Sequence, residues 1–160
     1  MKTEFRKAIL PQEIGSLLAF DRKAFPKADR FDRACWQACE SHWLIVGNTK
    51  VGCCAFEKNV DFHDAEGNAP NRRGSLYIST TGILPRFQKK GFGPLLKSWE
   101  IAYARYHGFN RIITNCRKRN ARMIALNRRF GFRIVQTIPR YYMEPTDSSV
   151  LMELLLDHAT

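Results

Sequence analysis

The chain has 160 residues, of which 44% are hydrophobic, so it is long enough for one well-packed core and short for two. This length predicts a single domain over residues 1–160. The sequence has neither a run of about eighteen apolar residues nor the hydrophobic centre of a signal peptide, which predicts a cytoplasmic protein without membrane contact. Five cysteines without a Cys-x-x-Cys pair, and scattered histidines, predict neither a disulfide framework nor a metal site.

The formal net charge of +11 is concentrated in one part of the chain. Between Ile83 and Phe130 lie twelve Lys or Arg residues and a single acid, Glu100, whereas the rest of the chain has fourteen residues of each sign. Such a segment predicts a polyanionic partner, either a nucleic acid or a small phosphorylated molecule. A solvated basic face is the alternative.

The first half of the chain predicts an antiparallel start. A strand, two helices and a hairpin are expected over residues 4–10, 11–20, 29–40 and 42–57. Pro11 is expected to begin the first helix, and Gly47 with Asn48 to form the turn of the hairpin. Residues 59–73 are rich in turn formers and predict a long exposed loop.

The second half predicts strands and helices in alternation, followed by two strands. Their expected ranges are 75–83, 94–107, 111–116, 120–130, 132–138 and 150–156. Pro94 suits the start of the first helix and Asn120 the N-cap of the second. Together the two halves predict an α/β (α+β) fold, with a mixed, mainly antiparallel central sheet of about six to seven strands flanked by helices.

The segment ILPRFQKKGFG, residues 83–93, joins a predicted strand to a predicted helix. It is not a Walker A loop, because Gly93 is followed by Pro94, and Leu96 stands where a dinucleotide fingerprint has its third glycine. Gly91 and Gly93 still leave backbone amides uncovered at the positive end of a helix. The segment therefore predicts a bound anion.

Three features together resemble the GNAT superfamily of acyl-CoA-dependent N-acetyltransferases. They are the pattern Ile83-x-Pro85-x-x-Gln88-x-x-Gly91-x-Gly93, the pair Asn120-Ala121, and the pair Gly131-Phe132 after a helix. The resemblance implies a GNAT-like fold and the transfer of an acetyl group from acetyl-CoA to a primary amine, by direct attack in a ternary complex. The acceptor amine stays open among a small molecule, a peptide N-terminus and a lysine.

The resemblance also implies where coenzyme A binds. The loop would cradle the pyrophosphate through the amides of Gln88, Lys89, Lys90, Gly91, Phe92 and Gly93. The strand before it, at Thr81, Gly82 and Ile83, would offer backbone groups to the pantetheine arm and one amide to the thioester oxygen. Asn120 and Asn127 complete the implied coenzyme contacts.

The chain departs from the family where the thiolate is protonated. Many members have a Tyr seven residues after the capping Asn, and this chain has Asn127. Asn127 is expected to point inward, where it would hydrogen-bond sulfur or pantetheine, or only satisfy nearby backbone. The pair Tyr141-Tyr142, in a predicted substrate-side loop, would supply the missing donor, with Tyr142 as the first choice.

The chain departs from the family also at the base. Positions that are acidic in other members are Asn115 and Ser79 here. A water held by hydroxyls is therefore expected to take the proton, with contacts from Tyr77, Ser79, Thr80 and Glu57.

Two other interpretations stay open. A basic nucleic-acid-binding module would use the same cations, but no recognised nucleic-acid motif is present, which disfavours it. A GNAT fold that binds coenzyme A without catalysis would explain Asn115 and Asn127.

Overall fold

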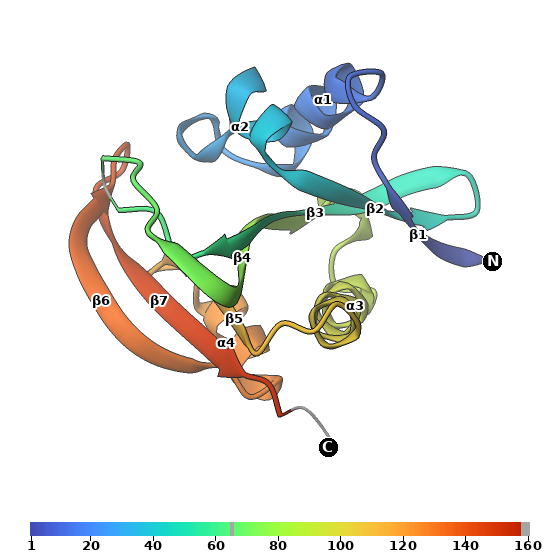
Figure 1. Cartoon of the computed structure of the whole chain (residues 1–160). Helices are drawn as coiled ribbons and strands as arrows, with labels where there is room; N and C mark the ends of the chain where they lie inside the picture. The colour runs from blue at the N-terminus through green and yellow to red at the C-terminus, as the bar shows by residue number, and fades with distance from the viewer. Residues whose placement is uncertain (65, 158–160) are drawn as a thin grey trace. The chain divides into compact units, whose positions relative to one another are not determined.

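The computed structural model describes residues 1–64 and 66–157 (Figure 1). In this part of the chain, seven strands form one sheet in the order β1-β2-β3-β4-β5-β7-β6, with four α-helices. The elements are β1 (Thr3–Lys7), α1 (Ile14–Ala24), α2 (Arg33–Ala38), β2 (Glu40–Val46), β3 (Thr49–Val60), β4 (Asn71–Ile83), α3 (Phe92–Tyr106), β5 (Arg111–Arg117), α4 (Ala121–Arg129), β6 (Arg133–Tyr142) and β7 (Asp147–Leu155). The β4–β5 pair is parallel, whereas β1–β2, β2–β3, β5–β7 and β6–β7 are antiparallel. The predicted mixed, mainly antiparallel sheet is confirmed.

The chain forms two compact units. Unit 1 comprises Met1–Glu57 and Ser79–Leu96, and unit 2 comprises Lys58–Ile78 and Lys97–Thr160. The elements β3, β4 and α3 contribute residues to both. Of the helices that the structure describes, none combines the length and the apolar character needed to cross a bilayer. The single domain and the cytoplasmic location stay predictions.

Unit 1 is built on the antiparallel strands β1, β2 and β3, and α1 and α2 lie on one side of them (Figure 1). The predicted hairpin turn is confirmed, with Gly47 in the left-handed region at φ 62°. Between strands and helices lies a core that includes Leu17, Phe20, Trp36 and Trp43. The rings of Phe20 and Trp43 meet edge to face at 5.7 Å, a favourable aromatic geometry.

Both predicted helices of unit 1 have different boundaries in the structure. The first begins at Ile14 rather than Pro11, because residues 10–13 form a turn in which the N–H of Ile14 donates to the Pro11 carbonyl at 3.2 Å. The second is short, because the Asp32 side chain accepts from the Cys35 N–H at 2.8 Å and caps the helix there. The strand β2 already begins at Glu40, which ends the predicted helix early.

Unit 2 contains the parallel β4–β5 ladder, from Ser75 opposite Arg111 to Ile78 opposite Thr114. The predicted N-cap is confirmed, since the Asn120 side chain accepts from the N–H of the residue three positions later at 3.2 Å.

Two predicted loops are partly strand. The predicted loop 59–73 is shorter than expected, because β3 extends to Val60 and β4 begins at Asn71. Tyr141 and Tyr142 end the strand β6 instead of lying in a loop.

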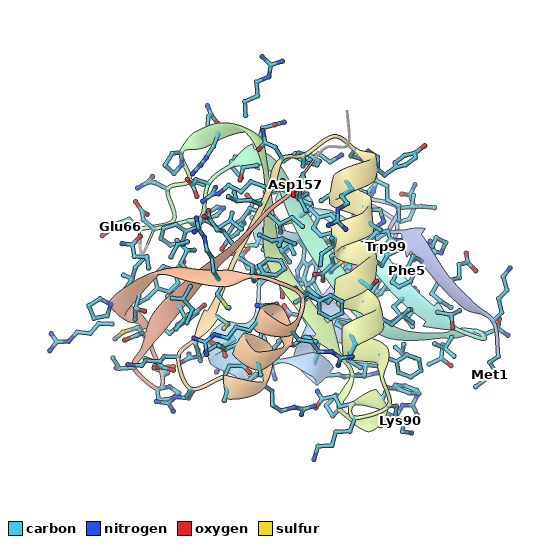
Figure 2. All side chains as sticks on the ribbon, turned by 90° about the horizontal axis from the view of Figure 1, so that it is seen from below. Met1, Phe5, Glu66, Lys90, Trp99 and Asp157 are labelled. Carbon is cyan, nitrogen blue, oxygen red and sulfur yellow. The ribbon has the colours of Figure 1, made fainter. Side chains whose placement is uncertain are left out.

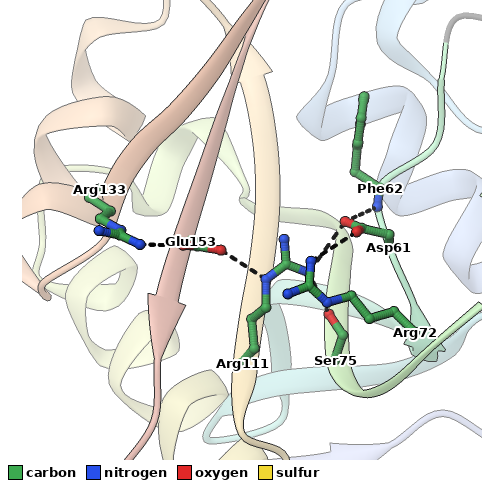
Figure 3. Close-up of polar contacts among 7 residues, drawn as sticks. All are labelled: Asp61, Phe62, Arg72, Ser75, Arg111, Arg133 and Glu153. Carbon is green, nitrogen blue, oxygen red and sulfur yellow. Dashed lines mark hydrogen bonds and ion pairs between the residues drawn. The ribbon is translucent and has the colours of Figure 1, made fainter. Parts of the chain in front are cut away.

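A chain of charged side chains ties the strands of unit 2 together (Figure 3). The buried Arg111 guanidinium donates to Glu153 at 2.8 Å, to Ser75 at 3.0 Å and to Asp61 at 3.3 Å. Glu153 also accepts from Arg133 at 2.8 Å. An unpaired guanidinium at this depth would cost several kcal/mol, so the carboxylates are needed to keep Arg111 inside.

Candidate active site

The glycine loop of unit 1 leads into the N-terminus of α3. Lys89 and Gly91 have φ of 60° and 86°, in the left-handed region. The N–H of Leu95 donates to the Gly91 carbonyl at 3.2 Å, which makes Gly91 the N-cap of the 15-residue α3. The N–H groups of Phe92 and Gly93 then belong to the first helical turn, where the helix itself offers no acceptor. Such amides at the positive end of a helix dipole form an anion site.

Space and charge around this N-terminus suit an anion. Apart from its two chain neighbours, a Cβ added to Gly91 would meet no atom within 4 Å, so there is open space at the N-cap. Figure 2 shows Lys90 on the loop at the amino end of α3. Lys89 and Lys90 are both exposed.

The Gln88 side chain braces the loop. Its Nε2 donates to the Ile83 carbonyl at 3.0 Å, across the 3₁₀ turn Pro85–Phe87. The amide of this side chain therefore fixes the distance between the end of β4 and the loop. The Ile83 carbonyl, one of the backbone groups predicted to serve pantetheine, accepts this bond.

The strand β4 is irregular just before the loop. Ala55 belongs to the core beneath α1 and α2, and Glu57, two residues further along β3, shares its face. Ser79 bonds to Glu57 and therefore faces this side of the sheet. Gly82 faces the same side, because a Cβ added to it would lie 2.6 Å from the ring of Phe25, which packs against the same core. Residues three apart on a regular strand face opposite sides, so the alternation breaks between Ser79 and Gly82. A break of this kind leaves backbone groups outside the ladder, where a ligand can use them.

A carboxylate lies beside Ser79. The Ser79 hydroxyl donates to Glu57 Oε2 at 2.6 Å, and both side chains are half-buried. The sequence gives Ser79 in place of an acid, and the structure brings an acid to it from the neighbouring strand. Glu57 was expected only as one of four contacts to a water.

In unit 2, Asn115 is the centre of a hydrogen-bonded cluster. Its Nδ2 donates to the hydroxyl oxygen of Tyr142 at 2.8 Å and to Ser149 Oγ at 3.0 Å. The Tyr77 hydroxyl donates to Asn115 Oδ1. The structure thus joins three residues that the sequence singled out separately, and it adds Ser149, which no sequence signal marked.

The two neighbouring tyrosines differ in what their hydroxyls do. Tyr141 donates to the His63 carbonyl at 2.9 Å, and burial raises the pKa of its phenol. Tyr142 accepts from Asn115, and the Arg117 guanidinium lies 4.7 Å from the centre of its ring. The proton of Tyr141 is therefore committed to a backbone acceptor.

Asn127 and Asn120 are both engaged within unit 2. Asn127 is 1% exposed and its Nδ2 donates to the sulfur of Met152 at 3.7 Å. A contact with coenzyme A would require this side chain to be uncovered. The Asn120 side chain is occupied as the cap of α4. Among the residues described, no group of three or more His, Cys, Asp or Glu side chains is arranged to hold a metal ion.

Residues 11–132 match the family model described as the acetyltransferase (GNAT) family. The chain belongs to this family. It is 34% identical over 155 residues to the probable N-acetyltransferase san of Drosophila melanogaster, covering 92% of this chain and 78% of that protein.

Solved structures of GNAT enzymes share the fold. The ribosomal-protein-S18-alanine N-acetyltransferase of Escherichia coli superposes with a TM-score of 0.80 at 14% identity, over 99% of this chain and 97% of that one. A Bacillus subtilis acetyltransferase in complex with CoA superposes with a TM-score of 0.75 at 20% identity, over 98% of this chain and 100% of that one. As a GNAT N-acetyltransferase, the protein uses acetyl-CoA, and the predicted enzyme class and co-substrate are confirmed.

Four of the five cysteines of this GNAT enzyme are poor nucleophiles. Burial raises the pKa of the Cys39 thiol to about 12 and that of Cys116 to about 11. Burial also raises the pKa of Cys35 and of Cys53. At neutral pH these four thiols stay protonated, and a protonated thiol does not attack a thioester.

Proposed function

We propose that the protein transfers the acetyl group from acetyl-CoA directly to a primary amine while both substrates are bound, with residues 1–160 acting as one domain. The helix N-terminus at Gly91 is the observation that carries the proposal, because it provides amides for a pyrophosphate. The raised pKa values of four cysteines favour direct attack over an acetyl-cysteine intermediate.

In the proposed complex, the amides of Gly91, Phe92 and Gly93 bind the pyrophosphate, and Lys89 and Lys90 balance its charge. Gln88 holds the loop in place through the Ile83 carbonyl. A backbone amide in the irregular stretch that includes Thr81 and Gly82 binds the thioester oxygen and stabilises the charge that develops there.

Tyr142 is proposed to protonate the departing thiolate. Its hydroxyl is oriented by Asn115, whereas the Tyr141 hydroxyl is bound to the backbone. A CoA-type thiol has a pKa near 8.5, as for cysteine, so this proton is helpful without being indispensable.

The acceptor is proposed to be a primary amine of a peptide N-terminus, a lysine or a small molecule. The test is a panel in which acetyl-CoA is mixed with one amine of each kind and free thiol is measured. Thiol release that depends on an amine, together with an acetylated amine found by mass spectrometry, supports the proposal.

Two outcomes would contradict it. Coenzyme binding without transfer to any amine would leave a GNAT fold without catalysis. Tight, steeply salt-dependent binding to nucleic acid with which coenzyme A does not compete would favour the nucleic-acid module.

A further inference from the structure

We propose that Glu57 is the proton acceptor of the reaction and that Ser79 Oγ passes the proton to it. The inference rests on the proposed direct transfer to an amine. It gives the reaction a base at the position where the sequence shows only a serine.

The contact between the two side chains is suited to this task. The Ser79 hydroxyl donates to Glu57 Oε2 at 2.6 Å, the short distance expected when the acceptor is an ionised carboxylate. In this arrangement the serine proton already points at the carboxylate. The serine oxygen is left to accept a proton from another group, such as a substrate nitrogen.

Ser79 lies on β4, the strand that is proposed to bind the thioester, and Glu57 lies on the neighbouring strand β3. Ser79 and Thr81 are two residues apart on β4, so their Cα atoms are at most about 7 Å apart. Both belong to unit 1, together with Glu57 and the glycine loop. Because the two side chains are half-buried, an incoming amine can reach the hydroxyl and the carboxylate is partly shielded from bulk water.

Neighbouring groups do not compete for the role. Cys39 lies close enough for the Glu57 charge and the Ser79 hydroxyl to act on it, but its pKa of about 12, raised first by burial, keeps it a neutral thiol. Asn115, at the other position where family members carry an acid, has an amide side chain that is not a base near neutral pH. Glu57, in contrast, has a carboxylate that is bonded to Ser79, a predicted site residue.

The proposed step balances in protons and electrons. The substrate ammonium gives a proton to Ser79 Oγ as the serine proton moves to Glu57 Oε2, which leaves a neutral amine and a neutral carboxylic acid. The amine lone pair forms the C–N bond, the C–S bond breaks, and the sulfur keeps that electron pair and takes a proton from Tyr142, the donor proposed above. The nitrogen then carries one proton more than the amide and releases it to water, from which Tyr142 regains its own. Glu57 returns its proton to water after the product leaves.

The test measures kcat and KM of Glu57→Gln and Ser79→Ala between pH 6 and pH 10, with the amine of the panel that reacts fastest. Each variant should lose roughly 10²-fold in kcat at neutral pH, the usual range for a general base, with unchanged CoA affinity. The loss should shrink as the pH rises, because hydroxide replaces the carboxylate. Ser79→Thr keeps a hydroxyl and should recover most of the rate.

A matched control and a double variant separate this role from a structural one. Glu4→Gln removes an exposed carboxylate of β1 and should leave kcat unchanged. Glu57→Gln/Ser79→Ala should be no slower than the slower single variant, because the two residues act as a unit.

The outcomes distinguish the inference from the function on which it rests. A wild-type protein that acetylates no amine of the panel contradicts the proposed function itself. An active wild type whose Glu57→Gln variant keeps full kcat, or loses the same factor at every pH, overturns the role of Glu57 alone.

Discussion

The side-chain amide of Asn115 donates a hydrogen bond to the hydroxyl oxygen of Tyr142 over 2.8 Å. A hydroxyl that accepts such a bond still carries its own proton and is fixed in orientation. Tyr141, the adjacent residue, instead donates its hydroxyl proton in a hydrogen bond to the His63 carbonyl. We therefore expect Tyr142, rather than Tyr141, to act as the acid.

Replacement of Tyr142 by Phe is therefore expected to lower kcat by roughly 10²-fold with little change in CoA affinity. Tyr141→Phe should change kcat less than twofold but should lower the unfolding free energy by about 1 kcal/mol, because it loses one hydrogen bond. Steady-state kinetics and thermal unfolding of both variants provide the check. Full turnover in both single variants and in the double variant would rule out a tyrosine donor.

The glycine at the start of α3 should be indispensable for coenzyme binding. Gly91→Glu places a side chain at φ 86° and a negative charge at the anion site, so we expect CoA no longer to raise the melting temperature. Gly108→Glu is the matched control, because Gly108 has φ 77° and, like Gly91, no atom within 4 Å of an added Cβ. The idea of a cradle fails if folded Gly91→Glu binds CoA as tightly as Gly108→Glu does.

The thiols should not carry the acetyl group. Incubation with acetyl-CoA in the absence of an amine is expected to leave the protein mass unchanged, because the raised pKa of Cys35, Cys39 and Cys116 keeps them protonated. Cys35→Ser, which alters an exposed cysteine, should keep full activity. A stable acetyl adduct on a cysteine that then reacts with amine would instead establish a covalent intermediate.

Glu13 should make the stability of the fold depend on acid pH. The pKa of Glu13 is lowered to about 2. The largest cause is the pair of hydrogen bonds from Arg6, at 2.9 and 3.0 Å, and the Ile9 N–H and Lys50 also lower this pKa. A depressed carboxyl pKa contributes stability that is present above the unfolded value of 4.5 and lost as the pH falls toward 2.

The corresponding variant is Glu13→Gln. It should be less stable than wild type by on the order of 1–2 kcal/mol at pH 7, a value reduced by exposure to solvent. The difference should narrow between pH 4.5 and pH 2, where wild-type Glu13 becomes protonated. Urea unfolding of both proteins at pH 7 and pH 3 measures the difference in their unfolding free energies. A difference that is the same at both pH values would show that the ionisation of Glu13 is not its source.

Local chemistry explains which parts of the fold the sequence predicted. Gly47 forms the hairpin turn through its left-handed φ, and Asn120 caps α4 with its side chain. Each acts only on residues three or four positions away, and both predictions are confirmed. The start of α1 was predicted at Pro11 and lies at Ile14, because residues 10–13 form a turn. In this turn the Glu13 carboxylate is bonded to Arg6 of β1 and Lys50 of β3. Those partners come from other strands and have no local signal.

The candidate site likewise contains a part set by neighbouring residues and a part set by residues far apart in the sequence. The glycine loop is a continuous motif, so its residues could be named from the sequence. Ser79 and Glu57 are 22 residues apart, and Asn115 and Tyr142 are 27 apart, so that only the pairing of strands brings each pair together. Burial of Asn127 likewise depends on β7, which supplies Met152.

The most direct test of the account is a transfer experiment with acetyl-CoA labelled in its acetyl group. Initial rates are measured while acetyl-CoA and the responsive amine are varied together, and the product is identified by mass spectrometry. The account predicts label on the amine nitrogen, double-reciprocal lines that intersect, and loss of transfer in Gly91→Glu but not in Gly108→Glu. Parallel lines with label on the protein, or equal transfer by both glycine variants, would contradict it.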